Sequence, residues 1–132
     1  MPAKQSDPKW VITAKGGFHQ LMRMDPDELN LRDVGGVYVI WHGGTKPGWL
    51  FVGESPSIGR AIDQALDMED ITEYESMGRV YITWSTIQQD FRRGVLLYLA
   101  QRMKPLIPNP RTPKEGSVDP IPVLAPGVKA EA

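Results

Sequence analysis

The sequence contains no cysteine, so it forms neither a disulfide nor a thiolate-ligated zinc site. It also lacks an apolar run long enough to cross a bilayer, and its first residues do not have the hydrophobic stretch of a secretory signal. These absences predict a cytoplasmic protein that has no membrane partner.

The chain has no excess of either charge, because its formal net charge is -1. Proteins that grip phosphate backbones usually carry a basic excess, since neutralising phosphates drives that binding. We therefore expect a protein partner or self-association, with nucleic acid as the weaker candidate.

The length of 132 residues and the hydrophobic content of 41% are sufficient for one domain with a core. We expect a flexible N-terminus over residues 1–8, a single domain over 9–110 and a proline-rich tail over 111–132. Proline excludes regular helix and central strand from the tail. The segment Ile121-Pro122-Val123-Leu124 is apolar enough to pack on the domain.

Hydrophobic and β-branched runs predict three strands, at 36–42, 49–52 and 79–84. The first two flank a glycine-rich turn and should form an antiparallel hairpin. Residues 10–12 are a further candidate for a short edge strand. The predicted fold class is α+β, a small three-stranded antiparallel sheet flanked by helices.

Capping patterns predict the helices. Asp25 should cap a short helix in which Pro26 occupies the first position. Ser57 should cap a helix that runs to about residue 68, and Ser85 or Thr86 should cap a last helix that ends before Pro105.

The last helix is apolar on more than one side. Its core-facing stripe steps by four residues through Ile87, Phe91, Val95, Leu99 and Met103. Leu96 and Leu97 lie about 100° and 200° round the helix from Val95. Either the tail or a second subunit should cover this second side.

Four features appear in a fixed order: Gly36-Val37-Tyr38, then Phe51-Val52-Gly53, then Arg60, and finally Lys104-Pro105 followed by Asn109. This order resembles the GIY-YIG nuclease family over residues 36–109. The resemblance implies that Tyr38 helps to activate water and that Arg60 steadies the phosphate. It also implies a glutamate on the last helix that holds one divalent metal ion, which with the arginine offsets the charge of phosphodiester cleavage.

The chain departs from the family pattern at two places. Phe51 keeps the ring of the second tyrosine but loses its hydroxyl. The glutamate position falls on Leu96 or Leu97, and leucine offers no oxygen to Mg²⁺. Glu54 and Asp90 lie at element ends, and nothing in the sequence brings them to the site, so we predict no metal ligand.

Each matched residue also has an ordinary interpretation. Tyr38 could be a packed strand tyrosine, and Arg60 could pair on the surface with Asp63 or Gln64. Asn109 could belong to a proline turn. His42 shares a strand face with Tyr38 and is a candidate acid or base, or else an exposed histidine.

Charges are unevenly distributed along the chain. An acidic stretch follows Arg60, and a basic stretch follows on the last helix and its exit. The basic stretch could bind nucleic acid or an acidic protein, or it could be a solvated face. Its candidate binding residues are Arg92, Arg93, Arg102 and Lys104.

The sequence therefore predicts a GIY-YIG-like domain without catalytic activity and without a cofactor, which acts as a binding or protein-interaction module. The alternative is a Mg²⁺-dependent DNA or RNA phosphodiesterase whose metal ligand has moved. A third hypothesis is an oligomerising domain that has no role with nucleic acid.

Overall fold

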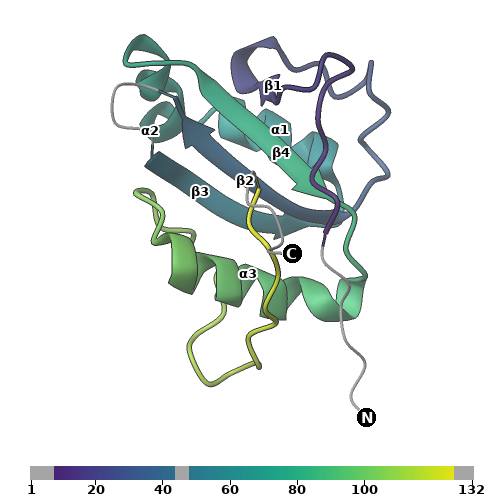
Figure 1. Cartoon of the computed structure of the whole chain (residues 1–132), viewed down its shortest axis with the longest axis vertical. Helices are drawn as coiled ribbons and strands as arrows, with labels where there is room; N and C mark the ends of the chain where they lie inside the picture. The colour runs from purple at the N-terminus through teal and green to yellow at the C-terminus, as the bar shows by residue number, and fades with distance from the viewer. Residues whose placement is uncertain (1–7, 44–47, 127–132) are drawn as a thin grey trace.

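The structure is a computed structural model that describes residues 8–43 and 48–126. Its centre is one antiparallel sheet of four strands in the order β1-β4-β2-β3 (Figure 1). The strands are β1 His19–Gln20, β2 Gly36–His42, β3 Gly48–Ser55 and β4 Val80–Ser85. Three of them match the predicted strands, and the expectation of a three-stranded sheet was wrong because the short β1 adds a fourth.

The extra strand does not lie where the sequence suggested. Residues 10–12 form no strand, although the Val11 amide donates to the Trp84 carbonyl at 3.0 Å. The pairing of β1 with β4 joins His19 to Ile82 and Gln20 to Tyr81. A two-residue strand carries too little periodicity to be recognised from sequence.

The predicted hairpin is confirmed. β2 and β3 pair antiparallel, with Tyr38 opposite Gly53 and Val39 opposite Val52. The register shifts between Ile40 and Trp41. Most of the proposed turn, residues 44–47, lies outside the described residues. β2 is buried on both faces, as its continuous apolar run indicates.

The helix predicted to follow Ser57 forms, and it ends two residues before the expected position of about 68. α1 spans Ile58–Leu66, and the Ser57 hydroxyl accepts a hydrogen bond from the Arg60 amide at 3.1 Å. A short helix, α2 Glu69–Thr72, and a 3-10 turn, η2 Glu73–Ser76, follow it. Another 3-10 turn, η1, spans Leu21–Arg23.

The helix predicted to start at Asp25 is absent, and residues 26–30 form turns instead. The Asp25 carboxylate does accept the amide of Asp27 at 3.0 Å, as a cap would. The backbone then turns at Asn30, whose φ is 55°. Because this left-handed conformation ends a helix, the capping signal produces only turns.

The last helix, α3, spans Gln89–Met103. Neither Ser85 nor Thr86 caps it, because Ser85 still belongs to β4 and the N-terminal cap is Gln88, which makes no side-chain cap bond. The helix ends before Pro105 as predicted, at Lys104, whose φ is 48°.

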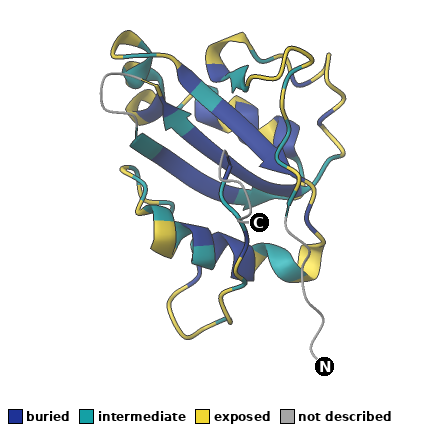
Figure 2. Cartoon of the chain, viewed as in Figure 1, coloured by how far each residue is buried: buried dark blue, intermediate teal, exposed yellow. Residues whose placement is uncertain are grey.

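Helices pack on both faces of the sheet. Tyr38 and Ile40 of β2 pack with α1 residues such as Ala61 and Ile62. The alternate β2 residues, Val37 and Val39, pack with α3. Figure 2 shows that β2, β3 and β4 are mostly buried, while β1 is only partly so. Figure 1 shows α1 behind the sheet and α3 along its lower side.

The chain after α3 covers two parts of the domain. The Leu106 and Ile107 amides donate to the Trp49 and Leu50 carbonyls at 3.0 and 2.9 Å, so this segment follows β3. Farther on, the Ile121 amide donates to the Gly94 carbonyl at 3.0 Å, and Val123 is buried against the α3 side of the sheet.

The tail therefore packs on α3 at Gly94, while Leu96 belongs to the core that α3 forms with the sheet. Gly94 permits the contact, because a Cβ there would lie 2.6 Å from the Asp119 carbonyl oxygen. Across the described ranges, no helix is long and apolar enough to cross a membrane.

Candidate functional site

A cavity of about 210 Å³ lies beside Tyr38, between β3, α1 and the chain after α3. We call it the Tyr38 hollow. Residues from these three regions and from β2 line it, including Tyr38, Phe51, Glu54, Ser55, Gln64, Asn109 and Arg111. The sequence motif therefore corresponds to a real depression, and some of its residues meet there.

Tyr38 forms the inner wall of the hollow. Its side chain is 7% exposed, and burial raises the pKa of its hydroxyl to about 12, an effect that the nearby Arg111 opposes and Glu54 reinforces. The phenol is therefore protonated at neutral pH, so it exchanges hydrogen bonds but does not act as an anion.

Two motif glycines have packing reasons. Gly53 lies opposite Tyr38, and a Cβ there would come 2.5 Å from the Tyr38 hydroxyl oxygen. Gly36 lies against the end of β4, where a Cβ would overlap the Ser85 carbonyl oxygen. Gly36 is therefore needed for β2 to lie against β4, and Gly53 is needed for the Tyr38 ring to lie where it does, whatever the function of the site.

Phe51 contributes only its ring. It is buried beside Tyr38, with the two ring centroids 6.1 Å apart. Val52, the next residue, packs on the α3 side of the sheet and does not line the hollow. The hollow therefore has one phenol where the family pattern has two tyrosines.

Asn109 connects the hollow to the sheet. Its side-chain nitrogen donates to the Val52 carbonyl at 3.0 Å, and its side-chain oxygen accepts the Arg111 amide at 2.9 Å. Asn109 therefore belongs both to a proline turn and to the lining of the hollow. The same turn places Arg111 at the rim of the hollow.

Sequence reasoning missed two charged residues of the site. Glu54 directly follows Phe51-Val52-Gly53, and nothing in the sequence indicated that its carboxylate would reach the site. Arg111 was assigned to the tail. Both line the Tyr38 hollow. The only signal in the sequence was their closeness to Gly53 and Asn109.

Arg60 is not part of the hollow. It is exposed on α1, its amide donates to the Ser57 hydroxyl, and its side chain has no hydrogen bond or ion pair with any described residue. The alternative pairing with Asp63 is also absent, because Asp63 pairs with Arg32. Gln64, one turn along α1, lines the hollow instead.

Leu96 and Leu97 lie away from the hollow. Leu96 is 0% exposed and packs with Val37, Val39 and Val52, on the opposite sheet face from Tyr38. Leu97 is also buried. Both helix positions at which the resemblance expects a metal ligand are therefore buried, and Leu96 belongs to the core.

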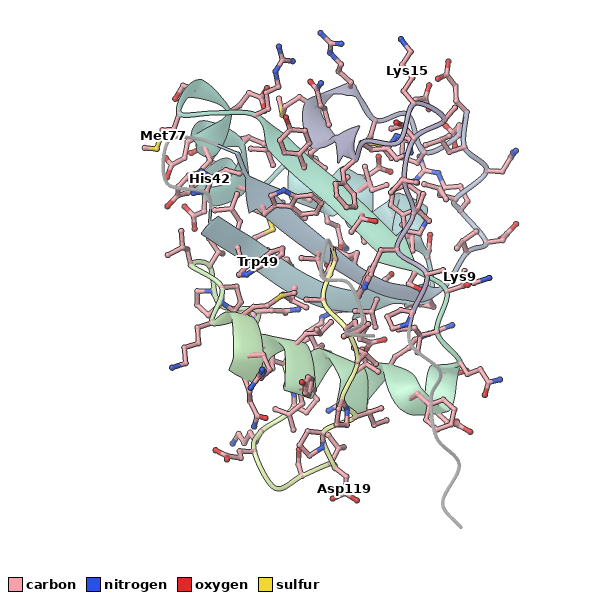
Figure 3. All side chains as sticks on the ribbon, viewed as in Figure 1. Lys9, Lys15, His42, Trp49, Met77 and Asp119 are labelled. Atoms are coloured by element: carbon pink, nitrogen blue, oxygen red, sulfur yellow. The ribbon has the colours of Figure 1, made fainter. Side chains whose placement is uncertain are left out.

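His42 is buried at the far end of β2, so its interpretation as an exposed histidine was wrong. Its ring stacks on Tyr74 with centroids 4.9 Å apart, and its Nδ1 has no hydrogen-bond partner among the described residues. Figure 3 shows His42 at the same end of the sheet as Trp49 and Met77, far from Asp119. It shares a face with Tyr38 but does not line the Tyr38 hollow.

The four basic candidates do not form one surface. The Arg92 guanidinium donates to the Ile87 carbonyl at 2.8 Å, and Arg102 lies 5.9 Å from the centre of the Tyr98 ring. Lys104 is the left-handed cap that ends α3. Arg93 lines a depression that adjoins the Tyr38 hollow, and Arg92 and Arg93 together line a further depression to which Glu54 also belongs.

Within residues 8–43 and 48–126, no three His, Cys, Asp or Glu side chains gather as a metal-ligating group. Comparison of the chain with protein-family models, with curated proteins and with solved structures gave no match.

Proposed function

We propose that the chain is a GIY-YIG-like domain that binds a ligand at the Tyr38 hollow and does not cleave phosphodiester bonds. The packing of Leu96 carries the proposal. A metal ligand at this helix position would have to leave the core and pass to the other sheet face, because Leu96 contacts Val37 and Val39 while Tyr38 faces α1.

The state of Tyr38 supports binding rather than catalysis. A general base works best when its pKa lies near the operating pH. Burial holds the Tyr38 pKa at about 12, so few molecules carry the phenolate at neutral pH. The neutral hydroxyl remains available as a hydrogen-bond donor and acceptor for a bound ligand.

The cation beside Tyr38 also supports this function. Arg111 lines the hollow and Arg60 does not. The guanidinium comes from a turn held by Asn109, which is suited to holding an anionic group in place.

One observation favours the alternative, a Mg²⁺-dependent DNA or RNA phosphodiesterase with a displaced metal ligand. Glu54 lines the same hollow as Tyr38 and Arg111, and a carboxylate near the phenol is what such an enzyme needs. Mg²⁺ is often bound through one or two carboxylates together with water and substrate phosphates, so Glu54 is the residue on which this alternative depends.

A cleavage assay separates the two functions. Purified protein is incubated with single- and double-stranded DNA and RNA in Mg²⁺ or Mn²⁺, beside the variants Glu54→Gln and Tyr38→Phe. We expect no cleavage by any of the three proteins. Cleavage by the unchanged protein that disappears in both variants would reject the proposal and establish the phosphodiesterase.

A protein partner is compatible with the same proposal, because the hollow is one part of the surface. Sedimentation of the purified chain tests self-association directly. We expect a monomer at micromolar concentration, because Leu96 and Leu97 are already buried within the chain and the tail packs on α3 at Gly94.

A further inference from the structure

A second hollow, of about 570 Å³, adjoins the first and is lined by cations. We call it the cationic hollow. Arg93 reaches it from α3, and Arg111 and Lys114 reach it from the chain after α3. Glu54, Pro110 and Arg111 line both hollows, so the two form a continuous depression along β3.

The three cations have no anionic partner at contact distance. Among the described residues the ion pairs within 4.0 Å are those of Arg32, with Asp27 and Asp63. Arg93, Arg111 and Lys114 form none. Cations that share a depression repel one another unless an anion lies between them, so their arrangement favours an anionic ligand.

Hydrogen bonds hold this depression in shape. Asn109 joins Arg111 to the sheet through the Val52 carbonyl, and the Thr112 amide donates to the Asn109 carbonyl at 3.0 Å. The Ser117 amide donates to the Lys114 carbonyl at 3.0 Å and closes the next turn. A preformed site loses less conformational entropy when a ligand binds.

We propose that the cationic hollow binds a phosphate monoester dianion. Three cations and the Glu54 carboxylate leave a net charge of plus two on its lining. A phosphate monoester carries about -1.5 to -2 at neutral pH and offers three acceptor oxygens, whereas each backbone phosphodiester carries a single charge. The lining therefore matches the monoester.

The group that bears the phosphate lies in the Tyr38 hollow. That hollow is walled by Tyr38 and Phe51 and offers the polar side chains of Gln64 and Asn109. An aromatic wall with a few polar groups suits a small organic body rather than a second phosphate. This inference rests on the proposed binding function and names its ligand class.

The test uses the whole chain of 132 residues and titration calorimetry at fixed ionic strength. The probes are inorganic phosphate, adenosine 5′-monophosphate, O-phosphoserine and dimethyl phosphate. We expect the monoesters to bind and dimethyl phosphate not to bind. Tighter binding of the nucleotide or of phosphoserine than of inorganic phosphate assigns the source, and equal binding of dimethyl phosphate overturns the proposal.

Three variants locate the site. Arg93→Ala, Arg111→Ala and Lys114→Ala should each weaken binding about tenfold or more, as expected when a charge-assisted hydrogen bond is lost. Arg23→Ala, an exposed arginine elsewhere on the chain, is the matched control and should leave affinity unchanged. An equal loss from Arg102→Ala, on the same helix but outside both hollows, would mean diffuse attraction and overturn the site.

Glu54→Gln gives a result that misfolding cannot imitate. Removing the only carboxylate of the cationic hollow should tighten binding of the monoester several-fold. Affinity should also fall as the pH drops through about 6, where a phosphate monoester takes up its second proton. Weaker binding by Glu54→Gln, or affinity that is the same at pH 5 and pH 7, would reject recognition of the dianion.

Failure here is distinguishable from failure of the proposed function. If the protein cleaves nucleic acid yet binds monoesters with the expected variant pattern, the non-catalytic function is wrong and the phosphate site stands. If it neither cleaves nor binds any monoester, the phosphate site is wrong and another ligand of the Tyr38 hollow must be sought.

Discussion

One face of the sheet carries a cavity, and the other face is closed by packed apolar side chains. On the α1 side, Tyr38 lines a cavity with an asparagine, a carboxylate and a guanidinium around it. On the α3 side, Val37 and Val39 are closed over by Leu96, Leu99 and Val123. The side chains of β2 therefore point alternately to the two faces. On one face Tyr38 lines a polar depression, and on the other Val37 and Val39 belong to a closed core. The comparison indicates that a charge can be accommodated beside Tyr38 but not at Leu96.

The largest effect should come from Leu96→Glu, which introduces a carboxylate at one of the two positions where the family resemblance expects it. Leu96 is 0% exposed, so the variant buries an unpaired charge and should lose at least about 4 kcal/mol of unfolding free energy. Urea unfolding measures the loss, and Leu96→Met, which conserves volume, should cost less than about 1.5 kcal/mol. A well-folded Leu96→Glu that Mg²⁺ stabilises further would contradict the contrast between the faces.

A smaller loss should follow Gly94→Val, which tests how the tail seals the α3 side. The new side chain meets the Asp119 carbonyl and the Ile121 side chain, and such overpacking costs about 1–3 kcal/mol. Gln101→Val, at an exposed position of the same helix, carries only the lower helix propensity of valine. Faster hydrogen exchange at the Ile121 amide in Gly94→Val alone would identify the released contact, and unchanged exchange would show that the contact is dispensable.

The Tyr38 side should show its own dependence on pH. The folded pKa of Tyr38, about 12, exceeds the unfolded value of about 10, so only the unfolded chain ionises between them. The contribution to stability is complete below pH 10 and is lost as the pH rises towards 12, by on the order of 2 kcal/mol.

Urea unfolding from pH 9 to pH 12 measures this loss, and Tyr38→Phe supplies the comparison. The variant should lack the part of the alkaline decline that Tyr38 causes. Identical declines in the two proteins would place the Tyr38 hydroxyl in solvent.

The smallest effect should come from Asn109→Ala. The variant removes the hydrogen bonds that its side chain makes with the Val52 carbonyl and the Arg111 amide, at a cost of about 1 kcal/mol. Thr112→Ala, in the same turn, should change stability by less than about 0.5 kcal/mol. If Asn109→Ala matched Thr112→Ala, the turn would not depend on its link to the sheet.

Local signals predicted the parts of the fold that local interactions determine. The apolar run at 36–42 became β2, and Ser57 capped α1 through a bond to an amide three residues away. The prediction at Asp25 failed although its cap bond forms, because Asn30 turns the backbone before a helix can continue. A capping residue indicates where a helix can begin, but it does not determine whether the following residues continue the helix.

The candidate site was predicted only in part, because its lining comes from distant segments. Tyr38, Phe51 and Asn109 were identified and do meet. Arg60 was placed by its order in the chain, and the direction in which its helix presents it depends on packing. Arg111 entered the site because the chain after α3 follows β3, a path that no local pattern encodes.

That path also covers an edge of the sheet that could otherwise pair with other molecules. Without the amides of Leu106 and Ile107, the carbonyls of Trp49 and Leu50 would be bare, and β3 would be the outermost strand with nothing beside it. Unprotected outer strands recruit strands from other molecules. We therefore expect residues 105–109 to protect β3 from such pairing, and a chain that stops at Met103 to precipitate or form oligomers of mixed size.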